Sequence, residues 1–135
     1  MPGTILVVDD NPDTADAIAL QLRESGHEVA KAYSAREALD LLDENPAFYL
    51  VVSDVRMPGV SGFDFRRVVR HRFPGLPMVL ITGTTITSDD VVPRDAIILQ
   101  KPVVIATLEH AIAEALQSSV SRNSRESTSN SFDSI

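Results

Sequence analysis

Cysteine and tryptophan are absent from this 135-residue chain, and lysine is scarce. Without cysteine there is no disulfide, no thiolate nucleophile and no zinc–thiolate site, which suits a reducing cytoplasmic setting. A chain of this length buries enough core to fold without a covalent staple. Only Lys31 and Lys101 are lysines among the twelve basic residues, so any role that needs a lysine has two candidates.

The chain also lacks long apolar runs and an excess of positive charge. Runs such as residues 5–8 and 78–81 are far shorter than the ~20 residues that span a bilayer, and acidic residues begin too early for a signal peptide. Nineteen acidic against twelve basic residues give a net charge of −7, which opposes broad binding to phosphate backbones or anionic lipid. We therefore predict a cytoplasmic protein that binds neither nucleic acid nor membranes.

The composition changes after Gln117. Residues 118–135 contain eight serines and few apolar side chains, and such a segment buries too little surface to offset the entropy lost on ordering. We predict one folded domain over residues 2–117, followed by a disordered, serine-rich tail over residues 118–135. A regulatory or docking tail is the alternative.

Within residues 2–117, short apolar runs alternate with amphipathic helical stretches, which is typical of a parallel sheet covered on both faces. The predicted strands cover residues 4–8, 28–32, 50–53, 78–82 and 96–100. Helices are expected to begin at the capping residues Asn11 and Ser34 and at Gly62, and a further helix runs through residues 108–115. The predicted fold is α/β: a doubly wound, five-stranded, flavodoxin-like sheet in the order 2-1-3-4-5.

Charged and hydroxyl side chains follow the predicted strands. In a sheet of this order the carboxyl ends of strands 1 and 3 border the ligand crevice, and the strand ends carry Asp9, Asp10, Asp54, Thr82 and Lys101. Crowded carboxylates raise one another's pKa values unless a cation neutralises them, and hard oxygen ligands suit Mg²⁺. A lysine and a threonine facing the same spot would bind a tetrahedral anion. The pattern therefore predicts a phosphoryl-transfer site.

Asp54 is the predicted nucleophile at this site. The chain has no cysteine and no evident serine–histidine pair, so a carboxylate would attack phosphorus and form an aspartyl phosphate. Asp54 stands alone at the centre of the predicted crevice, whereas Asp9 and Asp10 form a pair suited to holding metal.

These residues resemble the receiver domain of bacterial response regulators. The resemblance rests on Asp9–Asp10, the run 54–58 followed by Gly62, Thr82 and Lys101–Pro102, and it covers nearly the whole chain before the tail. It implies that a sensor histidine kinase or a histidine phosphotransfer protein supplies the phosphoryl group, and that a conformational change signals to a downstream protein effector. Such a domain assists its own phosphorylation and dephosphorylation but turns over no separate substrate, so no enzyme activity is expected.

The resemblance also implies a metal site and two modulating positions. Asp9, Asp10, Asp54 and the backbone carbonyl of Arg56 would hold Mg²⁺. The side chains of Arg56 and Thr84 would overlook the phosphoryl group, where they would modulate attack by water.

Three further residues would contact the phosphoryl oxygens in a receiver: Thr82, Lys101 and Gly83, the last through its backbone amide. The Lys101–Pro102 peptide resembles the cis peptide of the family, and only a peptide bond that precedes proline adopts the cis form at low cost.

Two features depart from the family's pattern. Many receivers carry a tyrosine or phenylalanine three residues before the site lysine, and its rotation reports phosphorylation, but this chain has Ile98 at that switch position. Pro93 interrupts the fourth crossover, so the fourth helix is expected to be shortened or missing. Our hypothesis is that residues 83–88 and the last helix transmit the signal instead.

Other functions stay open beside the receiver, which would itself be a single-domain response regulator or the receiver part of a hybrid kinase. One is a Mg²⁺-dependent phosphohydrolase that uses an aspartyl phosphate, although such enzymes place a second aspartate two residues after the nucleophile, where this chain has Asn11 and Arg56. The other is a pseudo-receiver that binds partners without being phosphorylated.

Four arginines crowd the predicted third helix: Arg66, Arg67, Arg70 and Arg72. A solvated helix face is the preferred interpretation of this group, and a docking patch is the alternative. Phenylalanines 63, 65 and 73 are expected to lie in the core or beside it. The three histidines lie on no shared predicted face near the acids, so we expect them to be solvated or to pack.

Overall fold

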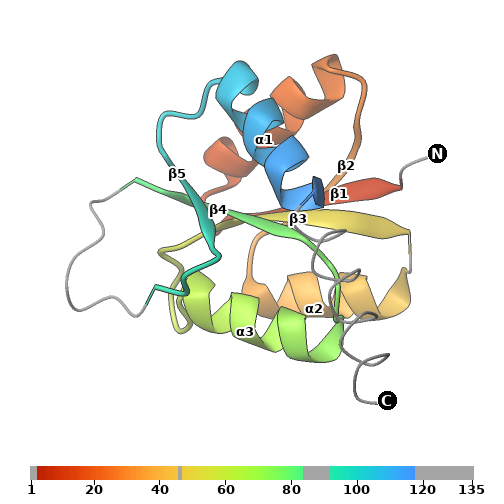
Figure 1. Ribbon diagram of the computed structural model, residues 1–135, viewed down its shortest axis with the longest axis vertical. Coiled ribbons are helices and arrows are strands. Elements are labelled where there is room, and N and C mark those ends of the chain that lie inside the picture. The colour runs from red at the N-terminus through yellow and green to blue at the C-terminus, as the bar shows by residue number, and fades with distance from the viewer. Residues whose placement is uncertain (1–2, 46, 84–91, 118–135) are drawn as a thin grey trace, which may run out of the picture.

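The computed structural model describes residues 3–45, 47–83 and 92–117, which form a sheet between two layers of helices (Figure 1). In chain order the elements are β1 (Thr4–Val8), α1 (Pro12–Glu24), β2 (Glu28–Ala32), α2 (Ala35–Glu44), β3 (Phe48–Asp54), α3 (Gly62–Arg72), β4 (Met78–Thr82) and β5 (Ile97–Gln100). Residues 105–117 form the last helix. All strands are parallel in the order β2-β1-β3-β4-β5, which confirms the predicted fold class.

Three strand boundaries differ from the prediction, one of which is the end of β3 at Asp54 rather than at residue 53. β3 begins at Phe48 rather than at residue 50, because Phe48 pairs with Thr4 at the start of β1. β5 begins at Ile97, one residue later than predicted. The predicted tail and residues 84–91 of the fourth crossover lie outside the described residues. Of that crossover, residues 92–96 are described and contain no helix.

The core has two halves, one on each face of the sheet. Side chains at alternate positions of β1 point to opposite faces: Ile5 and Val7 pack with residues of α1 and the last helix, whereas Leu6 and Val8 pack with residues of α2 and α3. Figure 1 shows the same arrangement, with α1 and the blue last helix on one face of the sheet and α2 and α3 on the other. Burial on both faces explains why the central strands are apolar without interruption.

Side-chain caps fix where the helices begin. Asn11 Oδ1 accepts hydrogen bonds from the backbone of α1, and Ser34 Oγ accepts one from Glu37 N at 3.0 Å. The Glu37 carboxylate accepts from Tyr33 N at 2.7 Å, one residue before the position of a standard capping box. Because the Asn11 cap follows directly after Asp10, α1 starts at the edge of the sheet where the acids lie.

The arginines of α3 correct one prediction. Arg66 is only 7% exposed, so it does not belong to a solvated helix face. It occupies the buried side of α3 together with Phe63, Phe65 and Val69, whereas Arg67 is exposed. Both phenylalanines lie in the core as predicted.

His27 has a packing role, in line with the expectation for the histidines. Its Nε2 lies 2.7 Å from Oε1 of Glu109, and its Nδ1 lies 3.2 Å from the hydroxyl of Tyr49. These contacts connect the loop before β2 to the last helix, away from Asp9, Asp10 and Asp54. Among the described residues, no helix combines the length and the apolarity that crossing a bilayer requires.

Candidate functional site at the carboxyl edge of the sheet

Backbone hydrogen bonds fix the positions of the residues that follow the strands. Asp9 N donates to Ala32 O at 3.1 Å, so β1 keeps its pairing with β2 beyond its last residue. Lys101 N donates in the same way to Thr82 O at 2.8 Å, across β5 and β4. Since the strands are parallel, their carboxyl ends meet at one edge, and the side chains of these residues converge there.

Three carboxylates gather at this edge: Asp9, Asp10 and Asp54. One oxygen from each lies within 4.8 Å of the other two, the arrangement that a metal ion could share. Asp9 and Asp54 are buried and Asp10 is exposed, so the cluster opens to solvent on the side of Asp10. An all-oxygen, acidic donor set of this kind fits the hard cation Mg²⁺.

Lys101 reaches into the same cluster. Its ammonium group donates a hydrogen bond of 3.1 Å to Oδ2 of Asp9 and lies 3.6 Å from Oδ1 of Asp54. The lysine side chain is one quarter exposed, which leaves its terminal charge accessible from the solvent side. The ammonium group of Lys101 therefore interacts with two buried carboxylates at once.

The surroundings of Asp54 act on its pKa in opposite directions. Burial raises the pKa of Asp54, the negative charge of Asp9 raises it further, and the positive charge of Lys101 opposes both. The backbone amide of Arg56 also favours the charged form, because it donates to Oδ1 of Asp54 at 3.4 Å. Added positive charge at this edge would therefore favour the ionised, nucleophilic form of Asp54.

Asp9 is held by a backbone donor of its own. Asn11 N donates to Oδ1 of Asp9 at 2.9 Å, while Oδ2 accepts from Lys101. Both oxygens of Asp9 are thus already oriented by the protein. Sequence reasoning did not anticipate this amide, because no side-chain pattern identifies a backbone donor.

The remaining predicted phosphoryl contacts lie beside Lys101. Thr82 is buried at the end of β4, and Gly83 follows it at an exposed position. A methyl group at Gly83 would lie 3.5 Å from Cδ of Lys101, so the glycine and the lysine side chain are neighbours. The Lys101–Pro102 peptide is cis, the geometry that the resemblance implies. Thr84 lies outside the described residues.

Gly62 brings the start of α3 against the end of β3. A Cβ atom at this position would lie 2.4 Å from the carbonyl oxygen of Asp54, so no larger residue fits without a backbone shift. Gly62 N donates to Val55 O at 2.7 Å and closes the loop between β3 and α3. This loop and Asp10 line an open hollow beside the carboxylates, into which Arg56 and Met57 also face.

Ile98 lies away from the carboxylates, in the interior of β5. It pairs with Leu80 of β4, is partly buried, and packs against the half of the core that α2 and α3 cover. Arg56 is exposed at the rim of the site. The structure thus brings together Asp9, Asp10, Asp54 and Lys101, and it places Ile98 inside β5, the strand that Lys101 follows.

Comparison with known proteins agrees with this geometry. The response regulator receiver domain family matches residues 5–113. Transcriptional regulatory protein AfsQ1 of Streptomyces coelicolor is 37% identical over 139 residues, which cover 100% of this chain and 59% of AfsQ1. Response regulator protein FleR of Pseudomonas aeruginosa is 39% identical over 83 residues, which cover 62% of this chain and 17% of FleR. The chain thus spans only part of these relatives.

A solved structure shows the same arrangement of strands and helices. The crystal structure of a response regulator receiver domain protein from Clostridium thermocellum matches with a TM-score of 0.77 and 30% sequence identity. The match covers 85% of this chain and 94% of that chain, so the similarity extends over an entire domain.

Proposed function

The chain belongs to the response regulator receiver domain family of two-component signalling, and we propose that it is a phospho-accepting receiver whose acceptor is Asp54. The observation that carries this proposal is the place of Asp54 between Asp9 and Lys101. Asp54 is buried, yet one of its oxygens lies 3.6 Å from the only described lysine at this edge of the sheet.

The proposed reaction transfers a phosphoryl group from a phosphohistidine to Asp54. A carboxylate oxygen of Asp54 forms a bond to phosphorus, the bond between phosphorus and the donor's imidazole nitrogen breaks, and the imidazole keeps the electron pair. The product is an aspartyl phosphate and a free histidine on the donor. The protein's contribution is to position the acceptor and to neutralise charge, as is usual in phosphoryl transfer.

Asp9, Asp10, Asp54 and the backbone carbonyl of Arg56 would hold Mg²⁺ at this site. When bound, the ion supplies positive charge that offsets the crowded carboxylates and the phosphoryl oxygens. The carboxylates support this assignment because they are hard oxygen donors that lie within reach of one another.

Lys101, Thr82 and the backbone amide of Gly83 would bind the transferred phosphoryl group. Lys101 can exchange its contact with Asp9 for a phosphoryl oxygen, since its side chain is flexible and partly exposed. The hydroxyl of Thr82 and the amide of Gly83 come from the end of β4, next to Lys101. These donors would stabilise charge that spreads over the phosphoryl oxygens in the transition state.

The donor in this proposal is a sensor histidine kinase or a histidine phosphotransfer protein, and the output is a conformational change read by a downstream protein. The relatives support this assignment because their names describe response regulators and transcriptional regulators. The chain would act as a single-domain response regulator or as the receiver part of a hybrid kinase.

A phosphohydrolase is not favoured by the residues around the acids. The position two residues after Asp9 is Asn11, whose side-chain oxygen accepts hydrogen bonds from Asp13 N and Thr14 N at the start of α1. The position two residues after Asp54 is Arg56, which cannot act as a carboxylic acid or base. Neither acid is therefore followed by the acid–base group that a hydrolase of this kind needs.

Intact-mass analysis tests the proposal. The chain is incubated with acetyl phosphate and Mg²⁺, and one added phosphoryl group per molecule is expected. The adduct should be absent from Asp54→Asn and from a sample treated with EDTA, and it should be retained by Asp43→Asn, which removes an exposed carboxylate far from the site. No adduct, either with acetyl phosphate or with a competent kinase, would instead favour the pseudo-receiver.

A further inference from the structure

Arg66 is an unusual residue for the inner side of α3. Its side chain is 9% exposed, although an arginine cannot lose its charge inside a protein. Burying a charge is costly unless a partner of opposite charge and good geometry accompanies it. The neighbouring Arg67 pairs with Asp64 on the exposed face of the same helix. Of these two adjacent arginines, only Arg66 points toward the interior.

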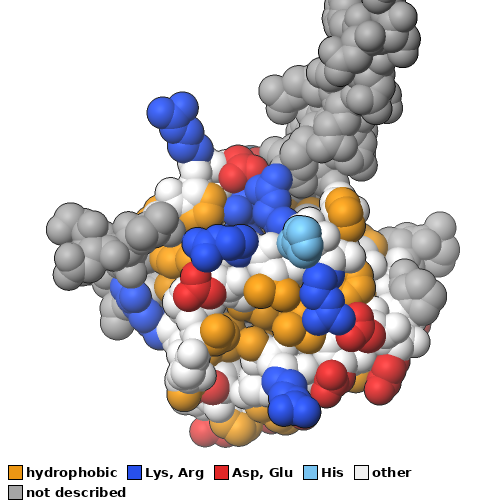
Figure 2. Space-filling view, turned by 90° about the horizontal axis from the view of Figure 1, so that it is seen from below, with side chains coloured by type: hydrophobic (Ala, Val, Ile, Leu, Met, Phe, Trp, Pro, Cys, Tyr) orange, Lys and Arg blue, Asp and Glu red, His pale blue; other side chains and the backbone are white. Residues whose placement is uncertain are grey.

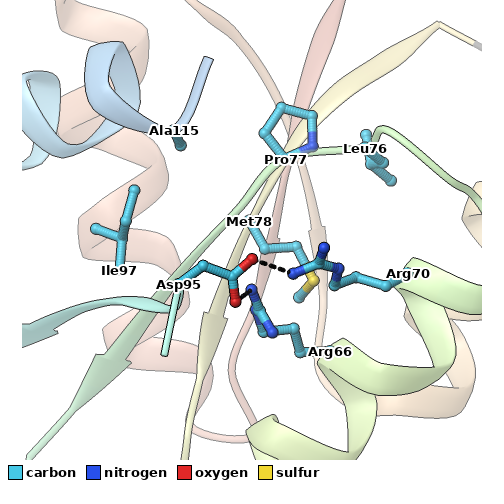
Figure 3. A pocket seen from close by; sticks show the side chains of 8 residues that line it. All are labelled: Arg66, Arg70, Leu76, Pro77, Met78, Asp95, Ile97 and Ala115. Carbon is cyan, nitrogen blue, oxygen red and sulfur yellow. Dashed lines mark hydrogen bonds and ion pairs between the residues drawn. The ribbon is translucent and has the colours of Figure 1, made fainter. Parts of the chain in front are cut away.

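Asp95, which precedes β5, supplies that contact. Its Oδ1 accepts a hydrogen bond of 2.9 Å from Nη2 of Arg66, and its Oδ2 accepts one of 2.6 Å from Nη1 of Arg70. Figure 3 shows the two guanidinium groups of α3 converging on the one carboxylate. Each carboxylate oxygen thus accepts from its own arginine, an arrangement well suited to binding a carboxylate.

Among the described residues, Arg66, Arg70 and Asp95 together carry one positive charge in excess. Two arginines face one carboxylate, and the exposed Arg94 adjoins Asp95 in the sequence. Seen from the side of α2 and α3, basic side chains lie among acidic and apolar ones (Figure 2). The chain as a whole carries a charge of −7, so this local excess of positive charge contrasts with the net charge of the molecule and attracts acidic groups.

An incoming carboxylate can displace that of Asp95 from the two arginines without exposing the core. Half of its side chain is exposed, and one third of Arg70 is exposed beside it. The hollow next to the carboxylate is lined by the apolar side chains of Leu76, Pro77 and Ile97. A carboxylate that arrives from solvent would therefore find two guanidinium groups together with an apolar wall.

We propose that Arg66 and Arg70 form a docking site for an acidic segment of a partner protein, and that Asp95 occupies this site in the free chain. The partner's glutamate or aspartate replaces Asp95 between the two arginines, and an aliphatic neighbour of that acid packs against the wall of Leu76 and Pro77. The observations favour a protein partner over nucleic acid because the site offers two matched donors for one carboxylate, within a chain whose net charge repels a polyphosphate backbone.

This site is separate from the proposed phosphorylation site. Its wall includes Met78 and Ile97, the first residues of β4 and β5, whereas Thr82 and Lys101 lie at the opposite ends of the same strands. Binding at the arginines can therefore be measured without phosphorylating Asp54. A failure of Asp54 to accept a phosphoryl group would therefore not affect peptide binding at Arg66 and Arg70.

A peptide titration tests the proposal in the full chain. The probe is a capped peptide of alternating glutamate and leucine, and its glutamine counterpart is the neutral reference. Binding is followed by isothermal titration calorimetry, which can be applied to the wild type and to every variant. Asp95→Asn should bind the glutamate peptide at least about tenfold more tightly than the wild type, because it removes the internal competitor from the site. The glutamine peptide should bind neither protein.

Asp64→Asn is the matched control, since it removes the same charge from α3 beside Arg67. It should leave the affinity for the glutamate peptide at the wild-type value. Equal gains in Asp64→Asn and Asp95→Asn would show a general charge effect and overturn the proposal.

Replacement of Arg70 completes the test. In the Asp95→Asn background, Arg70→Gln should abolish peptide binding. Because Arg66 is buried and its replacement can unfold the chain, Arg70→Gln is the primary variant, and circular dichroism verifies its fold. Binding that persists without Arg70 would contradict the site. Binding of inorganic phosphate or of a DNA duplex as tight as that of the peptide would contradict the acidic-protein partner.

Discussion

The ammonium group of Lys101 lies 3.6 Å from Oδ1 of Asp54, although Asp54 ends β3, Lys101 follows β5, and strand β4 lies between the two. The contact reaches across two strand spacings, which the four-carbon side chain of lysine helps to bridge. Lys101 is also the charged side chain that holds down the pKa of Asp54 against burial and against Asp9. The lysine is therefore part of what keeps Asp54 in the ionised form.

Lys101→Met should raise the pKa of Asp54, because the substitution keeps the length of the side chain and removes its positive charge. Phosphorylation by acetyl phosphate should slow, and the acid limb of its pH–rate profile should move to higher pH. NMR titration of the Asp54 carboxyl carbon measures the shift. Lys31→Met, which removes the lysine of the edge strand β2 that pairs with Asp16, is the control and should leave the titration unchanged.

Asp54→Asn should stabilise the fold at neutral pH. Burial raises the pKa of Asp54 above the value of 3.8 for an ordinary aspartate, so the folded state binds the proton more tightly than the unfolded state does. The stability that Asp54 contributes is therefore present below pH 3.8 and is lost as the pH rises through the folded-state pKa. Urea unfolding of both proteins at pH 7 and pH 3.5 measures the difference, which should shrink at the lower pH; a less stable variant at pH 7 would contradict this account.

Asp95→Asn should destabilise the fold by on the order of 1 kcal/mol at pH 7, once solvent screening of this half-exposed side chain is included. Burial alone would raise the pKa of Asp95, but the hydrogen bond from Arg70 and the charge of Arg66 outweigh it and hold the pKa at about 2. The stabilisation is thus present above pH 3.8 and is lost as the pH falls through about 2. Denaturant titrations between pH 7 and pH 2 should show the two proteins converging, and Asp64→Asn should show a smaller loss.

Gly62→Ala should cost about 1–3 kcal/mol of stability, because the new methyl group overlaps the carbonyl oxygen of Asp54 and forces the backbone apart. The same shift displaces the acceptor, so phosphorylation should slow as well. Gly59→Ala provides a contrast: Gly59 has φ +80° and open space around it, so alanine there costs stability through backbone strain alone. Thermal unfolding and the phosphorylation rate are measured for both variants; equal effects on the rate would contradict the role of Gly62.

Arg56→Asn should speed the loss of the phosphoryl group from Asp54, because a long side chain at this exposed position would obstruct attacking water. The backbone amide that Arg56 donates to Asp54 is kept in this variant. The measurement is the decay of the phosphorylated chain followed by intact mass. A slower decay in the variant would show that Arg56 assists hydrolysis instead.

The strands and the acidic edge could be predicted because their signals are local. Residues of β1 are buried on both faces, so Ile5 to Val8 form an uninterrupted apolar run that marks a central strand. Once the strands are placed, parallel pairing brings their carboxyl ends to one edge whatever the details of packing. Asp9, Asp54 and Lys101 therefore met as expected, although 92 positions separate the first residue from the last.

The contact of Asp95 with Arg66 could not be predicted in this way. It joins residues 29 positions apart, and Asp95 sits in a segment whose composition indicates only a turn. A signal for Arg66 did exist, since position 66 falls on the same helical stripe as Gly62 and Val69, both buried. An arginine on an apolar stripe implies a partner of opposite charge, but the partner's identity depends on tertiary packing.

β5 has only four residues and is about 13 Å long, with Asp95 just before it and Lys101 directly after it. One end of this strand thus belongs to the proposed docking site and the other to the proposed acceptor site. Ligands at two such sites obey the reciprocity of linked equilibria. A partner that displaces Asp95 from Arg66 and Arg70, and that distinguishes the phosphorylated from the unphosphorylated chain, shifts the phosphorylation equilibrium of Asp54 by the same factor. The amount of partner in the cell would then influence how much of the receiver is phosphorylated.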